Sequence, residues 1–251
     1  MTPAIAVVLW LWVAGMANTA VGQTHESDFF RPKRTFSTGV SLYTNGWGFD
    51  VLTTGKVGKK TDWAVALSVA TQKDPRETRV ESLFGEQGRR YVYDKQNVVF
   101  ALYTGAGVER IIQPLTAISK LTIRAGITGG PLVAFLKPYY LEIFRQVTGN
   151  EGVRQLGLYD PAVHNYGNII GEAEFFNGFD KIKLMAGFRV RAHATFNFTT
   201  SNIFVRALYI GVQADAYPRP LPIMTQYPNR SFIVAGFIGV QIGSAWAAKP
   251  F

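Results

Sequence analysis

The chain has 251 residues, of which 47% are hydrophobic and 14% aromatic, and its formal net charge is +9. This length suits a single domain, and the absence of cysteine excludes disulfide bonds and thiolate metal sites. The sequence has neither an arginine-rich helix nor an aromatic-studded RNA motif, so we expect no nucleic-acid partner. Membrane lipid and lipopolysaccharide, whose phosphates attract cations, are the expected partners of the basic charge.

The amino-terminal residues 1–22 carry no charged side chain and contain an apolar run over residues 5–13, followed by Ala-Val-Gly. Small residues at both ends of that tripeptide are typical of signal-peptidase cleavage, so residues 1–22 are predicted to be a secretory signal peptide. A retained membrane anchor is the alternative, although the apolar run is too short to cross a bilayer as a helix. Residues 23–34 are predicted to be a periplasmic tail, and residues 35–251 the folded domain.

Residues 36–44 alternate between apolar and polar side chains, which predicts a strand with one apolar face. Asn-Gly at positions 45–46 is the strongest short hairpin signal. The return strand is expected over residues 47–55, and a third strand over 63–71 repeats the same pattern. Residues 73–95 are highly charged and predict a long, water-exposed loop with room for a hairpin of its own.

A fourth strand is expected over residues 97–106, and a fifth begins at residue 119. The fifth meets Gly-Gly-Pro at positions 129–131, where proline cannot donate a ladder hydrogen bond. We therefore expect a bulge there and a shifted continuation to about residue 144. A second polar loop follows over residues 145–180, in which residues 169–178 could form a short helix.

Residues 181–198 show the clearest alternation in the chain, because every even position from Ile182 to Phe198 is apolar. The odd positions are mostly basic or polar, so this strand has one apolar and one basic face. Its length exceeds the five or six residues usual in soluble proteins, about right for a tilted strand that crosses a bilayer. Two further strands are expected over residues 203–216 and 231–246.

Together these segments predict an all-β protein, an antiparallel transmembrane β-barrel of about eight strands (ten is the alternative) with long extracellular loops. Trp47, Trp63 and Trp246 fall at strand ends on the apolar face, as interfacial aromatic residues do. A secreted lipocalin-like carrier, whose apolar face lines the inside, is the competing fold. The strand-end tryptophans and the alternation of long and short connections favour the outer membrane.

The carboxyl-terminal residues Gln241, Gly243 and Trp246 have the spacing of the assembly signal of barrel proteins, which makes the barrel assembly machinery an expected partner during biogenesis. The second aromatic residue of that signal is missing at Ala248.

The inward faces of the predicted strands carry many charges. Because a barrel of this size is filled by its own side chains, we predict a network that plugs the lumen, with Arg124, Arg189 and Arg191 converging on Asp50. A small anion pore lined by the same groups is the alternative. The inward charged or titratable residues are predicted to be Asp50, Lys120, Arg124, Lys183, Arg189, Arg191, His193 and Asp215.

No enzymatic activity, cofactor or metal is predicted. The sequence lacks Gly-x-Ser-x-Gly, and the alternative, a barrel-embedded lipid-modifying hydrolase, would depend on His193 or His164. Asp160, His164, Glu172 and Glu174 could bind a cation, but their spacing is nonspecific, and we expect solvated loop charges.

Five short sequence segments resemble segments of an outer-membrane protein family that is common in Bacteroidota and has no established activity. They are YTNGWG (43–48), DPRE (74–77), YVY (91–93), KPYYLE (137–142) and PIM (222–224). The family's glycine after Tyr-Val-Tyr is replaced here by Asp94. The resemblance implies an outer-membrane barrel and supplies no catalytic residues. A structural or interaction role in the envelope is therefore predicted: scaffold, adhesion, or part of a secretion or assembly complex.

Overall fold

The structure is a computed structural model, and the residues that it describes all belong to one compact unit, Pro32–Phe251. The predicted signal peptide and nearly all of the predicted tail lie outside the described residues. Among the described residues, no helix is both long and apolar enough to cross a membrane. The described ranges are 34–84, 89–114, 121–146, 152–198 and 204–246.

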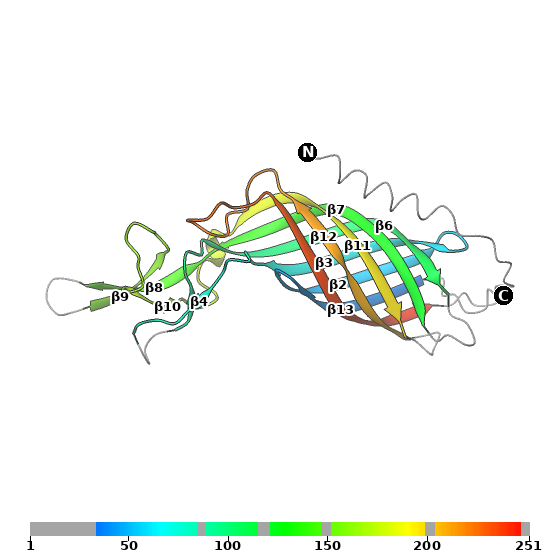
Figure 1. Cartoon of the computed structure of the whole chain (residues 1–251), viewed down its shortest axis with the longest axis horizontal. Coiled ribbons are helices and arrows are strands. Elements are labelled where there is room, and N and C mark those ends of the chain that lie inside the picture. Colours follow the sequence, from blue (N-terminus) through cyan, green and yellow to red (C-terminus); the bar gives the residue numbers. More distant parts are fainter. Residues whose placement is uncertain (1–33, 85–88, 115–120, 147–151, 199–203, 247–251) are drawn as a thin grey trace. The chain divides into compact units, whose positions relative to one another are not determined.

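Eight antiparallel strands close into a barrel, as the alternating sequence predicts (Figure 1). Each strand pairs with its neighbours along the chain, and the last strand pairs with the first, so the sheet has no free edge. The barrel strands are β1 (Arg34–Tyr43), β2 (Gly46–Lys56), β3 (Thr61–Gln72), β6 (Asn97–Gln113), β7 (Thr122–Pro138), β11 (Lys183–Asn197), β12 (Phe204–Ala216) and β13 (Phe232–Trp246).

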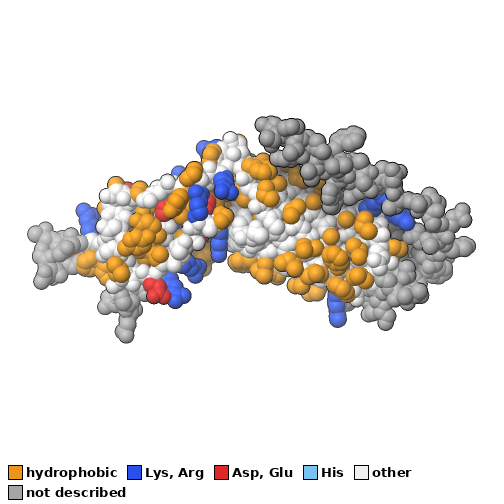
Figure 2. All heavy atoms as spheres, viewed as in Figure 1, with side chains coloured by type: hydrophobic (Ala, Val, Ile, Leu, Met, Phe, Trp, Pro, Cys, Tyr) orange, Lys and Arg blue, Asp and Glu red, His pale blue; other side chains and the backbone are white. Residues whose placement is uncertain are grey.

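The apolar face of each strand points outward. On β13, Val240 is 64% exposed whereas the next residue, Gln241, is 3% exposed. Figure 2 shows hydrophobic side chains spread over the barrel on the face in view. This arrangement is the reverse of a lipocalin-type barrel, which needs its apolar face inside.

The predicted bulge at Gly129-Gly130-Pro131 is wrong. Strand β7 keeps an unbroken register with β11, with Pro131 opposite Phe188, and its pairing with β6 resumes in the same register on both sides of the proline. Gly130 permits this, because a Cβ atom there would lie 2.2 Å from the carbonyl oxygen of Thr104. The register shift lies instead near the end of β6, between Ile111 and Gln113.

The long loops are more ordered than the sequence predicts, and they continue beyond one end of the barrel (Figure 1). The hairpin foreseen in the first loop is present as a short two-stranded sheet. The helix predicted over residues 169–178 is wrong, because residues 169–172 form a strand and a 3₁₀ helix begins only at Phe179. The loop elements are β4 (Arg79–Val80), β5 (Tyr91–Val92), β8 (Tyr140–Gln146), β9 (Gly152–Leu158), β10 (Ile169–Glu172) and η3 (Phe179–Lys181).

Strands β5, β8 and β10 share a small hydrophobic core, which includes Tyr91, Leu141 and Ile169. Asp94 then joins the first loop to the third. It has a positive φ of 63°, a conformation that glycine adopts more readily, and its carboxylate accepts a hydrogen bond of 3.0 Å from the backbone N–H of Gln226. Three loops that are far apart in the sequence therefore form one folded assembly above the barrel.

Candidate functional site

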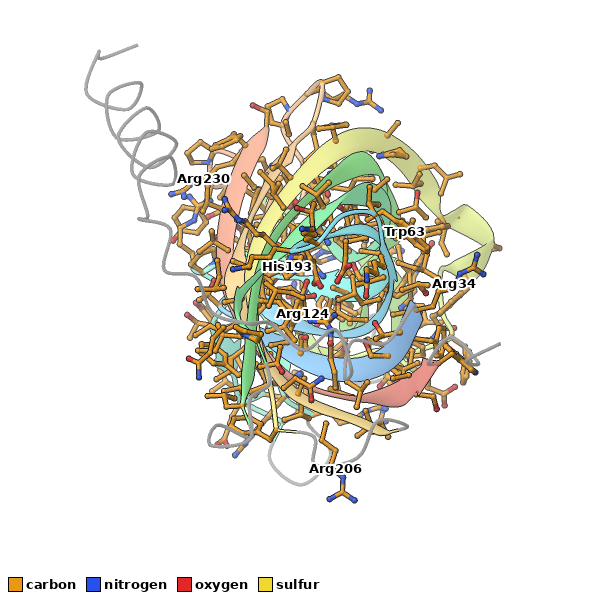
Figure 3. The ribbon with its side chains drawn as sticks, turned by 90° about the vertical axis from the view of Figure 1, so that its right-hand side faces the viewer. Arg34, Trp63, Arg124, His193, Arg206 and Arg230 are labelled. Carbon is orange, nitrogen blue, oxygen red and sulfur yellow. The ribbon has the colours of Figure 1, made fainter. Side chains whose placement is uncertain are left out.

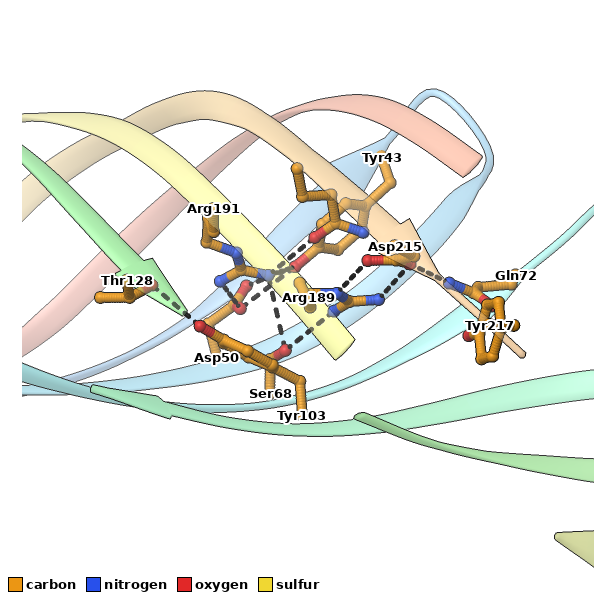
Figure 4. A network of polar contacts seen from close by, with 11 residues as sticks. Tyr43, Asp50, Ser68, Gln72, Tyr103, Thr128, Arg189, Arg191, Asp215 and Tyr217 are labelled. Atoms are coloured by element: carbon orange, nitrogen blue, oxygen red, sulfur yellow. Dashed lines mark hydrogen bonds and ion pairs between the residues drawn. The ribbon is translucent and has the colours of Figure 1, made fainter. Parts of the chain in front are cut away.

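The barrel interior holds the main concentration of buried charge in the described residues. Odd-numbered side chains of β11 point inward, which places Arg189 and Arg191 at 0% and 1% exposure. A buried charge is tolerated only when it is paired and hydrogen-bonded. The hydrogen-bond partners of these arginines come from β1, β2, β3 and β12 (Figure 4).

Arg191 crosses the lumen from β11 to β2, which is opposite β11 in the closed strand order. Its Nη1 donates to Asp50 Oδ1 at 2.7 Å, and its Nη2 donates to the hydroxyl of Tyr43 at 2.6 Å. The Tyr43 hydroxyl in turn donates to the Asp50 carboxylate at 3.1 Å. The guanidinium also lies 4.7 Å from the ring centroid of Phe237. Arg191 thus links three strands across the interior.

Arg189 forms a second ion pair beside the first. Its Nε and Nη2 donate to the two carboxylate oxygens of Asp215 at 2.6 and 2.8 Å, a bidentate geometry. Gln72 also donates to Asp215, and Tyr217 donates to Gln72 at 2.8 Å. The hydroxyl of Ser68 lies 3.4 Å from both arginines and connects the two pairs.

Arg124 does not join Asp50, and the prediction that the three arginines converge on that residue is wrong. The Nη1 atom of Arg124 lies 3.9 Å from Asp62 Oδ2 and 3.8 Å from Glu109 Oε2. Glu109 Oε1 lies 2.8 Å from His193 Nε2. The interior therefore contains two separate charge clusters: an upper one around Arg189 and Arg191, and a lower one around Arg124.

Figure 3, turned to look at one end of the molecule, shows Arg124 and His193 inside the ring of strands and Arg206 pointing away from it. The sequence prediction omits Asp62 and Glu109, because it begins the third strand at residue 63 and ends the fourth at residue 106. Glu109 keeps the inward parity of Tyr103, a signal that continuing the alternation would have found. Of the other predicted interior residues, Lys183 is exposed and Lys120 lies outside the described residues.

Gly126 makes room for the lower cluster. A Cβ atom on this β7 residue would lie 2.7 Å from both Glu109 Cγ and His193 Nε2. Gly126→Ala should therefore push the carboxylate and the imidazole apart and lower the free energy of unfolding by about 1 to 3 kcal/mol. Urea unfolding of the refolded protein in detergent micelles measures this change.

Gly129→Ala is the matched control, because a Cβ atom there would be 3.6 Å from its nearest neighbour, Phe188 Cζ. Equal stability changes for the two alanine variants would contradict a special role for Gly126.

A small cavity of about 20 Å³ lies beside Arg124 and is also lined by Thr195 and Gln241. A cavity of this size holds about one water molecule. Large side chains occupy the middle of the barrel, as expected for eight strands: Tyr103, Arg189, Arg191 and Tyr209 are all fully buried.

The three predicted interfacial tryptophans lie on the outer surface at strand ends. Trp47 and Trp246 are more than half exposed, whereas Trp63 is partly covered. The ring of Trp63 lies across Gly55, where a Cβ atom would be 2.4 Å from the indole nitrogen. Trp47 is at the loop end of the barrel, and the other two are at the opposite end.

The two histidines considered for catalysis have structural contacts. His193 pairs with Glu109, and His164 Nδ1 accepts a hydrogen bond of 2.9 Å from the backbone N–H of Asp160. Across the described ranges, no three His, Asp or Glu side chains are placed to hold a metal ion together.

No protein-family model matches this sequence, and no curated protein matches it significantly. Some solved structures are similar at low identity. Neisserial surface protein A shares 8% identity, with 85% of this chain and 95% of that chain covered and a TM-score of 0.39. Ail, the attachment invasion locus protein of Yersinia pestis, shares 10% identity over 85% and 98%, with a TM-score of 0.39. The N-terminal β-barrel domain of Pseudomonas aeruginosa OprF shares 8% over 85% and 97%, with a TM-score of 0.34.

Proposed function

We propose that this chain is a non-enzymatic outer-membrane β-barrel protein with a structural or interaction role in the bacterial envelope. The observation that carries the proposal is the exposed apolar face around the barrel. A water-soluble protein rarely exposes an apolar surface of this extent, whereas a closed barrel in lipid requires it. Exposed apolar residues from all eight strands include Val40, Phe49, Val65, Val108, Ile127, Phe188, Ile210 and Val240.

The proposed interaction role belongs to the loop assembly. Its own core holds it in a defined shape, while Val153, Leu158 and Tyr166 are about half exposed on its surface. A fixed surface of this kind suits contact with another envelope component. Outer-membrane lipid, lipopolysaccharide, the barrel assembly machinery and an envelope protein complex are the proposed partners. The signal peptide and the Bacteroidota family stay predictions from the sequence.

The proposal excludes lipid hydrolysis. His193 is enclosed within the barrel beside Glu109, and the Nδ1 atom of His164 is used by the backbone of its own turn. Purified protein should therefore not turn over phospholipid or lipid A. Turnover that disappears in His164→Ala or His193→Ala would establish the hydrolase instead.

Cell fractionation tests the location directly. The protein should separate with outer membranes, and unheated samples should migrate differently from boiled ones on a gel, as folded barrels do. Recovery of the protein in the soluble periplasmic fraction would overturn the proposal.

A further inference from the structure

Three phenylalanine side chains cluster on the segment between β10 and β11. The ring centroids of Phe175 and Phe176 lie 5.5 Å apart, those of Phe175 and Phe179 lie 5.4 Å apart, and those of Phe176 and Phe179 lie 6.0 Å apart. All three are exposed, and Phe176 is 79% exposed. Contacting aromatic rings that stay exposed together mark a surface with a partner.

The phenylalanine cluster continues the outward surface of the barrel. Phe175 packs edge-on against Phe100 of β6, with ring centroids 6.4 Å apart. The strand register places Phe100 beside Phe135 of β7, and Phe135 beside Leu184 of β11. The cluster is therefore continuous with the apolar outer surface of the barrel, at the end of the barrel that carries the long loops. In the proposed function, this end of the apolar surface lies at the surface of the bilayer.

Lys137, the penultimate residue of β7, supports the cluster from below. It is 4% exposed, and its Nζ lies 4.9 Å from the ring centroid of Phe175 and 5.4 Å from that of Phe179. This is cation–π geometry, which favours one arrangement of the two rings. The phenylalanine cluster is thus held in place by the barrel and is not a loose loop tip.

The charges next to the cluster in the chain balance one another. Glu174, Asp180, Lys181 and Lys183 provide two charges of each sign, so the segment has no net charge to attract a charged partner. The chemical feature that a partner can recognise is the apolar surface of the three phenylalanine rings. Aromatic side chains favour the boundary between head groups and acyl chains of a bilayer.

We propose that Phe175, Phe176 and Phe179 form a loop-borne membrane anchor that inserts into the outer leaflet of the bilayer surrounding the barrel. The anchor rests on the proposed function, since it requires a membrane at the level of the strand ends. It would bind lipid through acyl chains and glycerol regions and fix the β10–β11 segment at the membrane surface.

Spin labels on single cysteines test the anchor without background, because the chain has no cysteine. Phe176→Cys is compared with Ile238→Cys on the outer face of β13 and with Val163→Cys in the loop assembly, both exposed in the structure. The labelled proteins are reconstituted in phosphatidylcholine vesicles. Collision of each label with oxygen, which concentrates in lipid, is measured against collision with a water-soluble nickel complex.

The oxygen-to-nickel ratio at position 176 should be several-fold above that at 163 and close to that at 238. A ratio at 176 equal to that at 163, with position 238 still in lipid, would overturn the anchor and leave the proposed function standing. A label at 238 that is accessible mainly to nickel would overturn both.

Discussion

Arg191→Ala should lower the free energy of unfolding of the barrel by about 3 to 5 kcal/mol. The guanidinium donates to Asp50 and to Tyr43 across the lumen, and all three side chains are buried. Its removal leaves the buried Asp50 carboxylate without a cation partner. Removing one partner of a buried ion pair destabilises a protein more than replacing both partners with apolar residues. Urea titration of the folded barrel in lipid vesicles or detergent measures the loss.

Arg110→Ala is the control for this result, because Arg110 is exposed on the same kind of strand and should change stability by less than about 1 kcal/mol. The pair Arg191→Met with Asp50→Leu should be less destabilising than Arg191→Ala, since no unpaired charge is left. If Arg191→Ala were as stable as Arg110→Ala, the ion pair across the lumen would not contribute to the fold.

Arg124→Met should produce a loss of similar size, about 3 to 5 kcal/mol, in the lower cluster. Asp62 and Glu109 are direct cross-strand partners and both are buried, so two like charges face each other when the guanidinium between them is removed. Unfolding by urea again gives the change.

A second substitution, Asp62→Asn, should recover most of this loss, because one of the two negative charges is then gone. The double-mutant cycle measures the coupling between positions 124 and 62. Strictly additive effects of the two substitutions would show that Arg124 and Asp62 do not interact.

The strands and their facing were predictable because alternation is a local signal. In β11 the odd or even position of each residue predicts the face on which its side chain lies, so the inward direction of Arg189 and Arg191 follows from the sequence. The partner of a given charge depends on the register of distant strands, which no local pattern contains. For that reason the sequence alone pairs Arg124 with Asp50, whereas the structure places Arg124 beside Asp62 and Glu109.

Strand ends were harder to predict for a physical reason. Beyond Thr104, strand β6 runs through Gly105, Ala106 and Gly107, which carry little polarity, so the alternation fades before Glu109 restores it. The order of the loop assembly depends on contacts between loops, such as the burial of Ile169 against β5 and β8 residues. The charged composition of each loop, considered separately, predicts only that the loop is exposed to solvent.

A lumen closed by side chains should not conduct ions. Wild-type protein and Asp50→Ala are added to planar lipid bilayers, with folding of each preparation checked by its gel migration before and after heating. Neither protein should produce current steps above the lipid baseline, because losing one carboxylate destabilises the barrel without opening a path through it. Large, stable, anion-selective single-channel currents from the wild-type protein would contradict a plugged barrel and show that the basic interior is an open pore.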